Sequence, residues 1–301
     1  MDIFKITDSN FIGKRIDKVI FLLKKNDLSR SQIQILIKNK DILVNEKNIK
    51  SNYLVKMNDE IKIKKTSLVK IELKKENIPL DIIYEDNDIL VINKQRGLVV
   101  HPGSGNKEHT LVNALMFHIS NLSNIDDCRP GIVHRIDKDT SGMLLIAKNN
   151  KTHRLLAQQF LEHSIHREYK ALVKGVITED SGRILAPIAR SRVNAKRMCV
   201  DVVLGKEAES CFKVIKRLKN ATLVSVKIKQ GRTHQIRVHF EYIKHPIIGD
   251  KIYGLNNREI INDGQILHAY KISFFHPIIK KRMIFTSKLP DYFLNAIKLF
   301  K

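Results

Sequence analysis

The sequence has little cysteine and no apolar run long enough to span a membrane. Its three cysteines, Cys128, Cys199 and Cys211, include no close pair, which argues against a disulfide framework and against a zinc ribbon. The first residues, Met-Asp-Ile-Phe-Lys, carry an acid where a secretory signal peptide carries basic charge. We therefore expect an unprocessed, soluble protein of the reducing cytoplasm.

Acidic residues are also scarce. Lys and Arg number 54 against 31 Asp and Glu, which gives a formal net charge of +23. This excess favours a polyanionic partner, because cations gain affinity when they release counterions from phosphates. A general bias of the sequence toward Lys, Ile and Asn is the simpler alternative, and charge alone leaves it open.

Two familiar ligand-binding patterns are missing. The glycine-rich segment 97–105 lacks the spacing and the Lys-Ser/Thr pair of a P-loop. His234 and His239 are five residues apart and have no acidic partner at zinc-site spacing. We therefore expect neither a bound nucleoside triphosphate nor a metal ion.

The chain is long enough for a small and a large domain. Residues 1–65 form a basic unit that predicts two short helices, at 17–25 and after Ser29, and then strands beginning at Ile42 and Glu60. Residues 66–80 mix lysines with a proline and predict a linker. Residues 81–301 contain many short strand-like runs and few helices, which indicates an α+β domain.

The segment 134–142, His-Arg-Ile-Asp-Lys-Asp-Thr-Ser-Gly, crowds charged and hydroxyl side chains between apolar runs. The runs 129–133 and 143–147 predict buried strands, so the segment between them is expected to form a turn, where catalytic groups are common. Asp137 and Asp139 are both candidates, since paired carboxylates cleave glycosidic bonds. Asp139, which precedes Thr-Ser-Gly, is more simply a turn former.

A second charged cluster follows the strand-like run 222–228. If a helix begins after Gly231, its first two turns carry Arg232, His234 and Arg237. Helix N-termini attract anions, and added arginines strengthen that preference. This cluster is therefore expected to bind phosphate or carboxylate groups.

Tyr169 lies in the predicted strand 168–173. Alternation places it on the same face as Ala171 and Val173. Its own pattern therefore indicates a core tyrosine with a hydrogen-bonded hydroxyl.

The N-terminal segment resembles the S4-like RNA-binding domain. The likeness rests on Arg15-Ile-Asp-Lys, Leu28-Ser-Arg-Ser-Gln, Ile42-Leu-Val-Asn and Asp59-Glu-Ile. It implies that the second helix and the loop after it contact structured RNA, with Arg30 and Lys38 at phosphates. Each of these two cations, taken singly, also fits a solvated helix face.

Four later segments resemble, in the same order, the signature motifs of RluA-family pseudouridine synthases. They are 134–142, 167–173, 231–239 and 267–269. The likeness covers nearly the whole chain. It implies a mixed, mostly antiparallel catalytic sheet, and isomerisation of uridine to pseudouridine without a metal or an organic cofactor.

The resemblance also implies roles for residues. Asp137 is implied as the catalytic aspartate and Arg237 as its cationic partner. Tyr169 is implied as a ring that stacks on the flipped uracil, with a hydroxyl that could assist proton removal from C5. Leu267 is implied to line the base pocket. Apart from the resemblance, Arg135, Arg232 and Lys94 are candidates for contact with the RNA backbone, and Arg232 and Lys94 also fit a solvated surface. Arg135 and His134 are expected to support the catalytic loop.

Within this family the chain looks most like the subfamily that acts on the large ribosomal subunit. That implies uridines in the helix 69 loop of 23S rRNA, in a large subunit or its precursor, as substrate, with a monomer as the default. One departure is visible, since Gln95 and Arg96 replace the family's usual proline turn. The alternatives are an idle RNA-binding assembly factor and a nucleoside hydrolase that uses Asp137 and Asp139.

Overall fold

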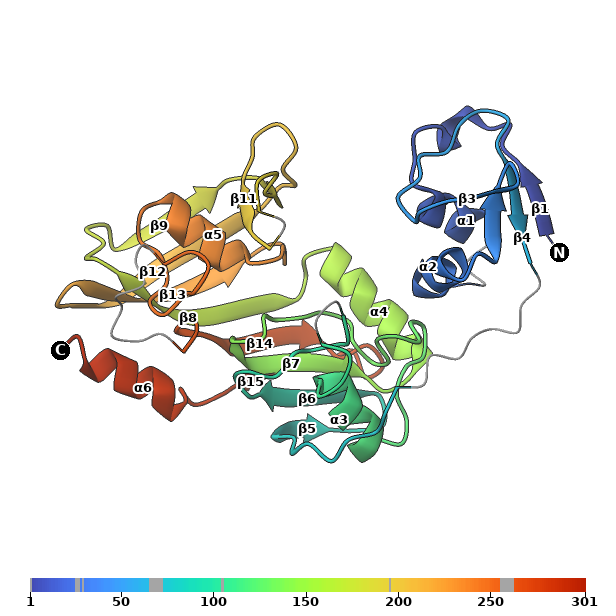
Figure 1. Ribbon diagram of the computed structural model, residues 1–301. Coiled ribbons are helices and arrows are strands. Elements are labelled where there is room, and N and C mark those ends of the chain that lie inside the picture. The colour runs from blue at the N-terminus through green and yellow to red at the C-terminus, as the bar shows by residue number, and fades with distance from the viewer. Residues whose placement is uncertain are drawn as a thin grey trace. The chain divides into compact units, whose positions relative to one another are not determined.

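The computed structural model describes residues 2–24, 28, 30–64, 73–103, 106–194, 196–254 and 263–301. The chain divides into two compact units (Figure 1), which are Met1–Lys74 with Asn124–Pro130, and Lys75–Ser123 with Gly131–Lys301. We call them the N-terminal unit and the large unit. Much of the predicted linker, together with Ser29, lies outside the described residues. No helix of the described ranges is both long and apolar enough to cross a membrane.

The N-terminal unit combines a four-stranded antiparallel sheet with two helices. Its elements are β1 (Asp2–Lys5), a 3₁₀ turn (Ser9–Phe11), α1 (Ile16–Leu23), α2 (Arg30–Lys38), β2 (Ile42–Val44), β3 (Lys47–Asn48) and β4 (Glu60–Ile63). The strands lie in the order β1-β4-β2-β3. Ile20 of α1 and Ile33 and Ile37 of α2 are buried in one cluster with the sheet. The predicted helices and strands of this segment are confirmed.

The large unit is built on one nine-stranded sheet. The order is β5-β6-β7-β14-β8-β13-β12-β9, and β15 also pairs with β14. Its strands are β5 (Ile82–Glu85), β6 (Ile89–Lys94), β7 (Ser141–Ala147), β8 (His166–Lys174), β9 (Ser181–Leu185), β12 (Glu209–Leu218), β13 (Ala221–Ile228), β14 (Leu267–Phe275) and β15 (Arg282–Thr286). Only β7 and β14 pair in parallel among them, which confirms the expected mixed, mostly antiparallel sheet.

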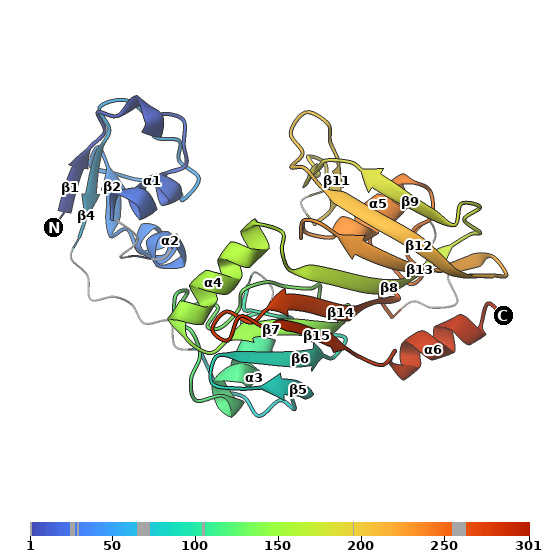
Figure 2. The same ribbon diagram turned by 180° about the vertical axis from the view of Figure 1, so that it is seen from behind.

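Helices and one hairpin complete the large unit. They are α3 (Leu111–His118), α4 (Asn150–Leu161), α5 (Gln235–Tyr242), α6 (Asp291–Lys298), and the pair β10 (Ile188–Arg190) and β11 (Met198–Val200). Alternate side chains of β7 point to opposite faces of the sheet. Met143 and Leu145 pack with Leu156 of α4, whereas Leu144 and Ile146 pack in the cluster that includes α3. The ribbons of β7, α3 and α4 can be followed from two sides in Figures 1 and 2. The charged segment before β7 is therefore attached to a strand that is buried on both sides.

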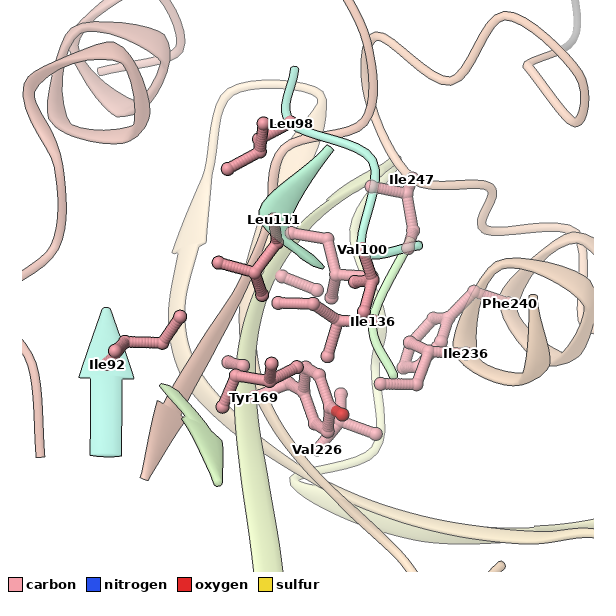
Figure 3. Packing of buried hydrophobic residues seen from close by; sticks show 14 of the residues in the cluster. Ile92, Leu98, Val100, Leu111, Ile136, Tyr169, Val226, Ile236, Phe240 and Ile247 are labelled. Carbon is pink, nitrogen blue, oxygen red and sulfur yellow. The ribbon is translucent and has the colours of Figure 1, made fainter. Parts of the chain in front are cut away.

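The alternation along β8 is as predicted. Tyr169, Ala171 and Val173 belong to the main core cluster, whereas Leu172 packs with Phe293 of α6 in another cluster. Figure 3 shows the Tyr169 ring among the apolar side chains of that core.

Two sequence predictions are wrong in detail. The run 129–133 is not a strand, since only Ile132 forms an isolated bridge, to Ile146. Pro130 has no N–H to donate, and Gly131 has a φ of +73° that interrupts extended backbone. The helix expected after Gly231 begins later, at Gln235, because His234 has a left-handed φ of 57°.

Gly142 allows β7 and β14 to approach closely. It lies opposite Ala269 in the parallel register, and its φ is +114°. A Cβ at this position would lie 2.3 Å from the Ala269 carbonyl oxygen. This contact places the first residue of β14, Leu267, beside the segment 134–140.

We expect Gly142→Ala to destabilise the large unit by about 3 kcal/mol or more, because the alanine is strained at this φ and its Cβ meets backbone. Urea unfolding followed by circular dichroism measures the change. The matched control is Gly103→Ala, where an added Cβ meets no atom within 4 Å. Equal stabilities of the two variants would show that β14 has room to move away.

Candidate active site

Six of the residues predicted for the site line one pocket of the large unit. They are Arg135, Asp137, Tyr169, Arg232, Arg237 and Leu267. They come from the segment before β7, from β8, from the segment that leads into α5, and from the start of β14. The pocket is thus assembled from four parts of the chain that are far apart in sequence.

Arg237 is held between two carboxylates. Its Nη1 donates to Asp137 Oδ2 at 3.0 Å, while its Nε and Nη2 donate to Asp250 Oδ2 and Oδ1 at 2.6 and 2.8 Å. Burial would lower the pKa of Arg237, but the hydrogen bonds and charges of Asp250 and Asp137 raise it above its usual value. The guanidinium is therefore charged, and it has one fixed direction from which to face Asp137.

Asp250 is a site residue that the sequence reading missed. Its side chain has no exposure to solvent, and besides Arg237 it accepts the backbone N–H groups of Ile252 and Tyr253, at 2.9 and 3.1 Å. The available signal was an acidic residue directly after the apolar Pro246-Ile-Ile-Gly segment. An aspartate there needs a buried partner.

Tyr169 is 6% exposed and lines the pocket from β8. Its ring packs in the core with Val226 and Ile236 (Figure 3). Burial raises the pKa of Tyr169, the charge of Arg167 opposes that rise, and the charge of Asp137 adds to it. The hydroxyl is therefore protonated near neutral pH.

Tyr253 packs against Arg237, and His234 lies beside the Tyr253 hydroxyl. The Tyr253 hydroxyl lies 2.9 Å from His234 Nδ1 and accepts the Met198 N–H at 2.9 Å, while its ring faces the Arg237 guanidinium at 5.1 Å. Burial raises the pKa of Tyr253 to about 12 and lowers that of His234. Both groups are therefore neutral near pH 7 and add no charge beside Arg237.

Several predicted contacts with the RNA backbone have protein partners. Arg232 Nε donates to the Glu207 carbonyl at 2.9 Å, while Arg135 is exposed at the rim. Lys94 was wrongly predicted to contact phosphate. It is 2% exposed, and its Nζ donates to the carbonyls of Gln95, Leu98 and Lys138 at 2.7, 2.8 and 3.0 Å. It therefore ties the end of β6 to the segment that carries Asp137.

Support for the segment 134–140 comes from its neighbours. His134 Nε2 accepts the Leu145 N–H at 2.9 Å, and burial lowers the pKa of His134 to about 3, so it is neutral. Asp139 lies in the turn closed by the Thr140 N–H on the Asp137 carbonyl at 3.2 Å. Arg96, which replaces part of the expected proline turn, donates to the Gly264 carbonyl.

The polar network behind the pocket includes His268. Its Nδ1 lies 2.7 Å from Ser141 Oγ, and its Nε2 lies 2.6 Å from Ser287 Oγ. Ser141 Oγ is also 2.7 Å from the Tyr292 hydroxyl of α6. Burial lowers the pKa of His268 to about 4, so it is a neutral hydrogen-bonding residue that links β7, β14 and α6.

One group of described residues has the ligand atoms for a metal ion. Asp86, Asp88 and His276 place such atoms within 4.8 Å of one another. Asp86 accepts the N–H groups of Asp88 and Ile89 and the Tyr84 hydroxyl, and His276 Nε2 bonds to it at 2.9 Å. These hydrogen bonds explain why the three side chains lie close together, because Asp86 stabilises the turn before β6.

Two further predicted residues, Arg30 and Lys38, belong to the N-terminal unit. Lys38 is exposed at the end of α2. Arg30 begins α2, and its side chain lies outside the described part of the structure. Their contacts with RNA stay predictions.

Comparisons with known proteins agree on the kind of protein. A family model for RNA pseudouridylate synthase matches residues 88–242, and a model for the S4 domain matches residues 14–61. The uncharacterized RNA pseudouridine synthase YlyB of Bacillus subtilis is 43% identical over 287 residues, which cover 95% of this chain and 94% of that protein. Ribosomal large subunit pseudouridine synthase D of Pseudomonas aeruginosa is 36% identical, with coverage of 96% and 92%.

A solved structure gives the same result. The human protein RNA Pseudouridylate Synthase Domain Containing 1 is similar with a TM-score of 0.60 and 26% identity. The match covers 73% of this chain and 86% of that chain. It supports the fold of the large unit.

We expect the free energy of unfolding to decrease as the pH is lowered, partly because of His268. Its pKa is about 4 in the folded protein and about 6.5 when unfolded, so the unfolded chain binds the proton first as the pH falls. This lowers the free energy of unfolding by roughly 1.4 kcal/mol per pH unit between about pH 6.5 and pH 4. In His268→Gln the slope measured by urea unfolding should be shallower by that amount. Equal slopes would mean that His268 is already charged in the folded protein.

Proposed function

Because the chain belongs to the RNA pseudouridylate synthase family, we propose that it isomerises uridines of 23S ribosomal RNA, with Asp137 as the catalytic carboxylate. The family and its isomerase activity on RNA confirm what the sequence motifs predicted. The target and the site residues are the proposed part. The observation that carries the assignment of Asp137 is its 3.0 Å contact with the fixed Arg237 guanidinium inside the pocket.

The reaction explains why an ionised carboxylate is needed. The C1′–N1 bond of uridine breaks, a C1′–C5 bond forms, C5 loses a proton and N1 gains one. An ionised aspartate can attack the sugar or the base, or it can remove a sugar proton. The Arg237 guanidinium donates to the Asp137 carboxylate and fixes its direction.

Asp137 is a better candidate than Asp139. Asp137 lines the pocket and contacts Arg237, whereas Asp139 lies further along the turn, with its Cβ and Cγ facing Gly264. A nucleoside hydrolase that uses both carboxylates would need both at the substrate. The geometry therefore favours one catalytic aspartate.

Tyr169 is proposed to hold the uracil. Its ring lies at the pocket wall, where a base that has left its stack can lie against it. Its raised pKa keeps the hydroxyl protonated, which suits a hydrogen-bond donor better than a base for the C5 proton. Leu267, buried at the start of β14, would supply an apolar contact to the same base.

The proposed target is the helix 69 loop in the large subunit or its precursor. Two similar proteins, of Pseudomonas aeruginosa and Zymomonas mobilis, are named ribosomal large subunit pseudouridine synthase D. The choice of helix 69 rests on the resemblance to that subfamily. A loop uridine is also favourable physically, because an unpaired base costs less to flip than a paired one. The S4 unit would raise the local concentration of RNA at the pocket.

We expect Asp137→Asn to abolish pseudouridine formation in helix 69. The amide cannot act as the nucleophile or base, although it keeps the size of the side chain. Carbodiimide modification and primer extension on 23S rRNA, from a deletion strain complemented with each variant, give the measurement. Asp139→Asn is the matched control and should restore the wild-type stops.

Restored stops with Asp137→Asn would remove this residue from catalysis. Release of free uracil by the wild type would instead indicate a hydrolase. Absence of stops with the wild type would indicate another target or an assembly factor without activity.

We expect the combined substitution Arg30→Gln and Lys38→Gln to weaken RNA binding in low salt without changing the rate at saturating RNA. Loss of two phosphate contacts should reduce the slope of log affinity against log salt by about 1.4 to 1.8. Filter binding over a salt series measures this slope. Lys298→Gln with Lys301→Gln, two exposed lysines at and beyond the end of α6, is the control of equal charge. The same slope in both double variants would place the RNA elsewhere.

A further inference from the structure

Arg167 is a buried arginine of the pocket that holds Asp137, and it has no carboxylate partner. It lies on β8 two residues before Tyr169, so the two side chains point to the same face of the strand, about 7 Å apart along it. Both line the pocket. Arg167 is 8% exposed, and across the described parts of the chain no carboxylate lies within ion-pair distance of it. Buried charges in proteins are normally paired, so this one calls for a ligand.

The contacts of the Arg167 guanidinium leave hydrogen-bond donors unused. Nη2 donates to the Lys229 carbonyl at 3.2 Å, whereas Nε is buried and has no acceptor among the described residues. Nη1 lies against Gly231, where an added Cβ would be 2.7 Å from it. The Phe160 ring lies 5.3 Å from the guanidinium and supplies packing rather than an acceptor oxygen. Unmatched donors on a buried cation indicate a ligand that carries acceptor oxygens.

The other arginines of the pocket differ from Arg167 in their surroundings. Arg237 is paired with two carboxylates, Arg232 donates to a backbone carbonyl, and Arg135 is exposed at the rim. A phosphate of the RNA backbone can meet Arg135 from the solvent. Arg167 can be reached only by the part of the substrate that enters the pocket, which in the proposed function is the uracil base.

The base gains negative charge in each role open to Asp137. If the carboxylate attacks C1′, the C1′–N1 bond breaks and its electron pair stays on the base. If it removes a sugar proton, the electrons of that C–H bond form a double bond to C1′ and expel the base with the same charge. If it adds to C6, the electrons of the C5–C6 double bond move to the O4 carbonyl. Formation of the C5–C1′ bond and transfer of the C5 proton to N1 then restore a neutral base.

We propose that Arg167 is a further catalytic residue, whose guanidinium binds a carbonyl oxygen of the uracil and stabilises the negative charge that forms there. The inference rests on the proposed function, since it requires a uridine whose base lies against Tyr169. A fixed donor that points to the place where charge develops is worth more in a closed pocket than in water. A cation without a carboxylate partner interacts more strongly with the charged base than with neutral uridine, so it lowers the barrier and not only the dissociation constant.

The test compares Arg167→Gln and Arg167→Lys with the control Arg217→Gln. The substrate is a hairpin RNA with the helix 69 sequence and an isotope-labelled target uridine, whose conversion is followed by chromatography of nuclease digests. We expect Arg167→Gln to lower the single-turnover rate at saturating RNA about 100-fold, with a dissociation constant close to that of the wild type. Arg167→Lys keeps the charge and should recover part of the loss. Arg217 donates to the Ile177 carbonyl at 2.8 Å outside the pocket, so its variant should match the wild type.

A target nucleotide with a more stable base anion separates a catalytic role from a structural one. In 5-fluorouridine the electron-withdrawing fluorine stabilises negative charge on the base, so cleavage of its C1′–N1 bond depends less on a cation. The loss of rate caused by Arg167→Gln should therefore be several times smaller on 5-fluorouridine than on uridine. If Arg167→Gln does not fold, as judged by circular dichroism, Arg167→Lys carries the same comparison.

Equal losses of rate on the two nucleotides would overturn the inference, because a purely structural role of Arg167 predicts them. Weaker and less salt-dependent binding with an unchanged rate at saturating RNA would also overturn it, since that result indicates a phosphate contact. A wild type that modifies another uridine of 23S rRNA would contradict the proposed target instead, and the same comparison at that uridine would still decide the role of Arg167.

Discussion

The geometry of the site depends on how Arg237 divides its donors. Two of its nitrogens are fixed by the fully buried Asp250, and a third reaches Asp137. The bidentate contact removes the rotational freedom of the guanidinium before any substrate binds. Asp137 itself is on a turn, so its direction is set by a partner on another element. Preorganisation of this kind is what a charged catalytic group requires.

The surrounding fold holds the turn that carries Asp137 close to Arg237 of α5. The segment 134–140 runs directly into β7, a strand that is buried on both faces of the sheet. Lys94 ties the middle of the segment to β6 through the Lys138 carbonyl, and His134 ties its start to Leu145. The close parallel contact at Gly142 then brings Leu267 to the same place. Each link is short and buried, so the turn is held although its residues are polar.

The sequence predicted the parts of this site whose signal is local. The motifs around Asp137, Tyr169 and Arg237 could be found because their residues are contiguous and matched a family, and the faces of β8 followed from simple alternation. The role of Asp250 and the burial of Lys94 could not be predicted, since an isolated Asp or Lys in a sequence gives no sign of the partners that tertiary packing supplies. The late start of α5 depended on the left-handed His234, which residue type does not reveal.

The contact between Ser141 and Tyr292 spans 151 residues. Tyr292 belongs to α6, and β14, in the centre of the sheet between β7 and β8, is made after both of its neighbours. During synthesis the N-terminal unit is therefore complete long before the pocket can close. A nascent chain that stops before these elements carries the N-terminal unit without a finished pocket, so the order of the elements along the chain delays assembly of the pocket until β14 and α6 have been made.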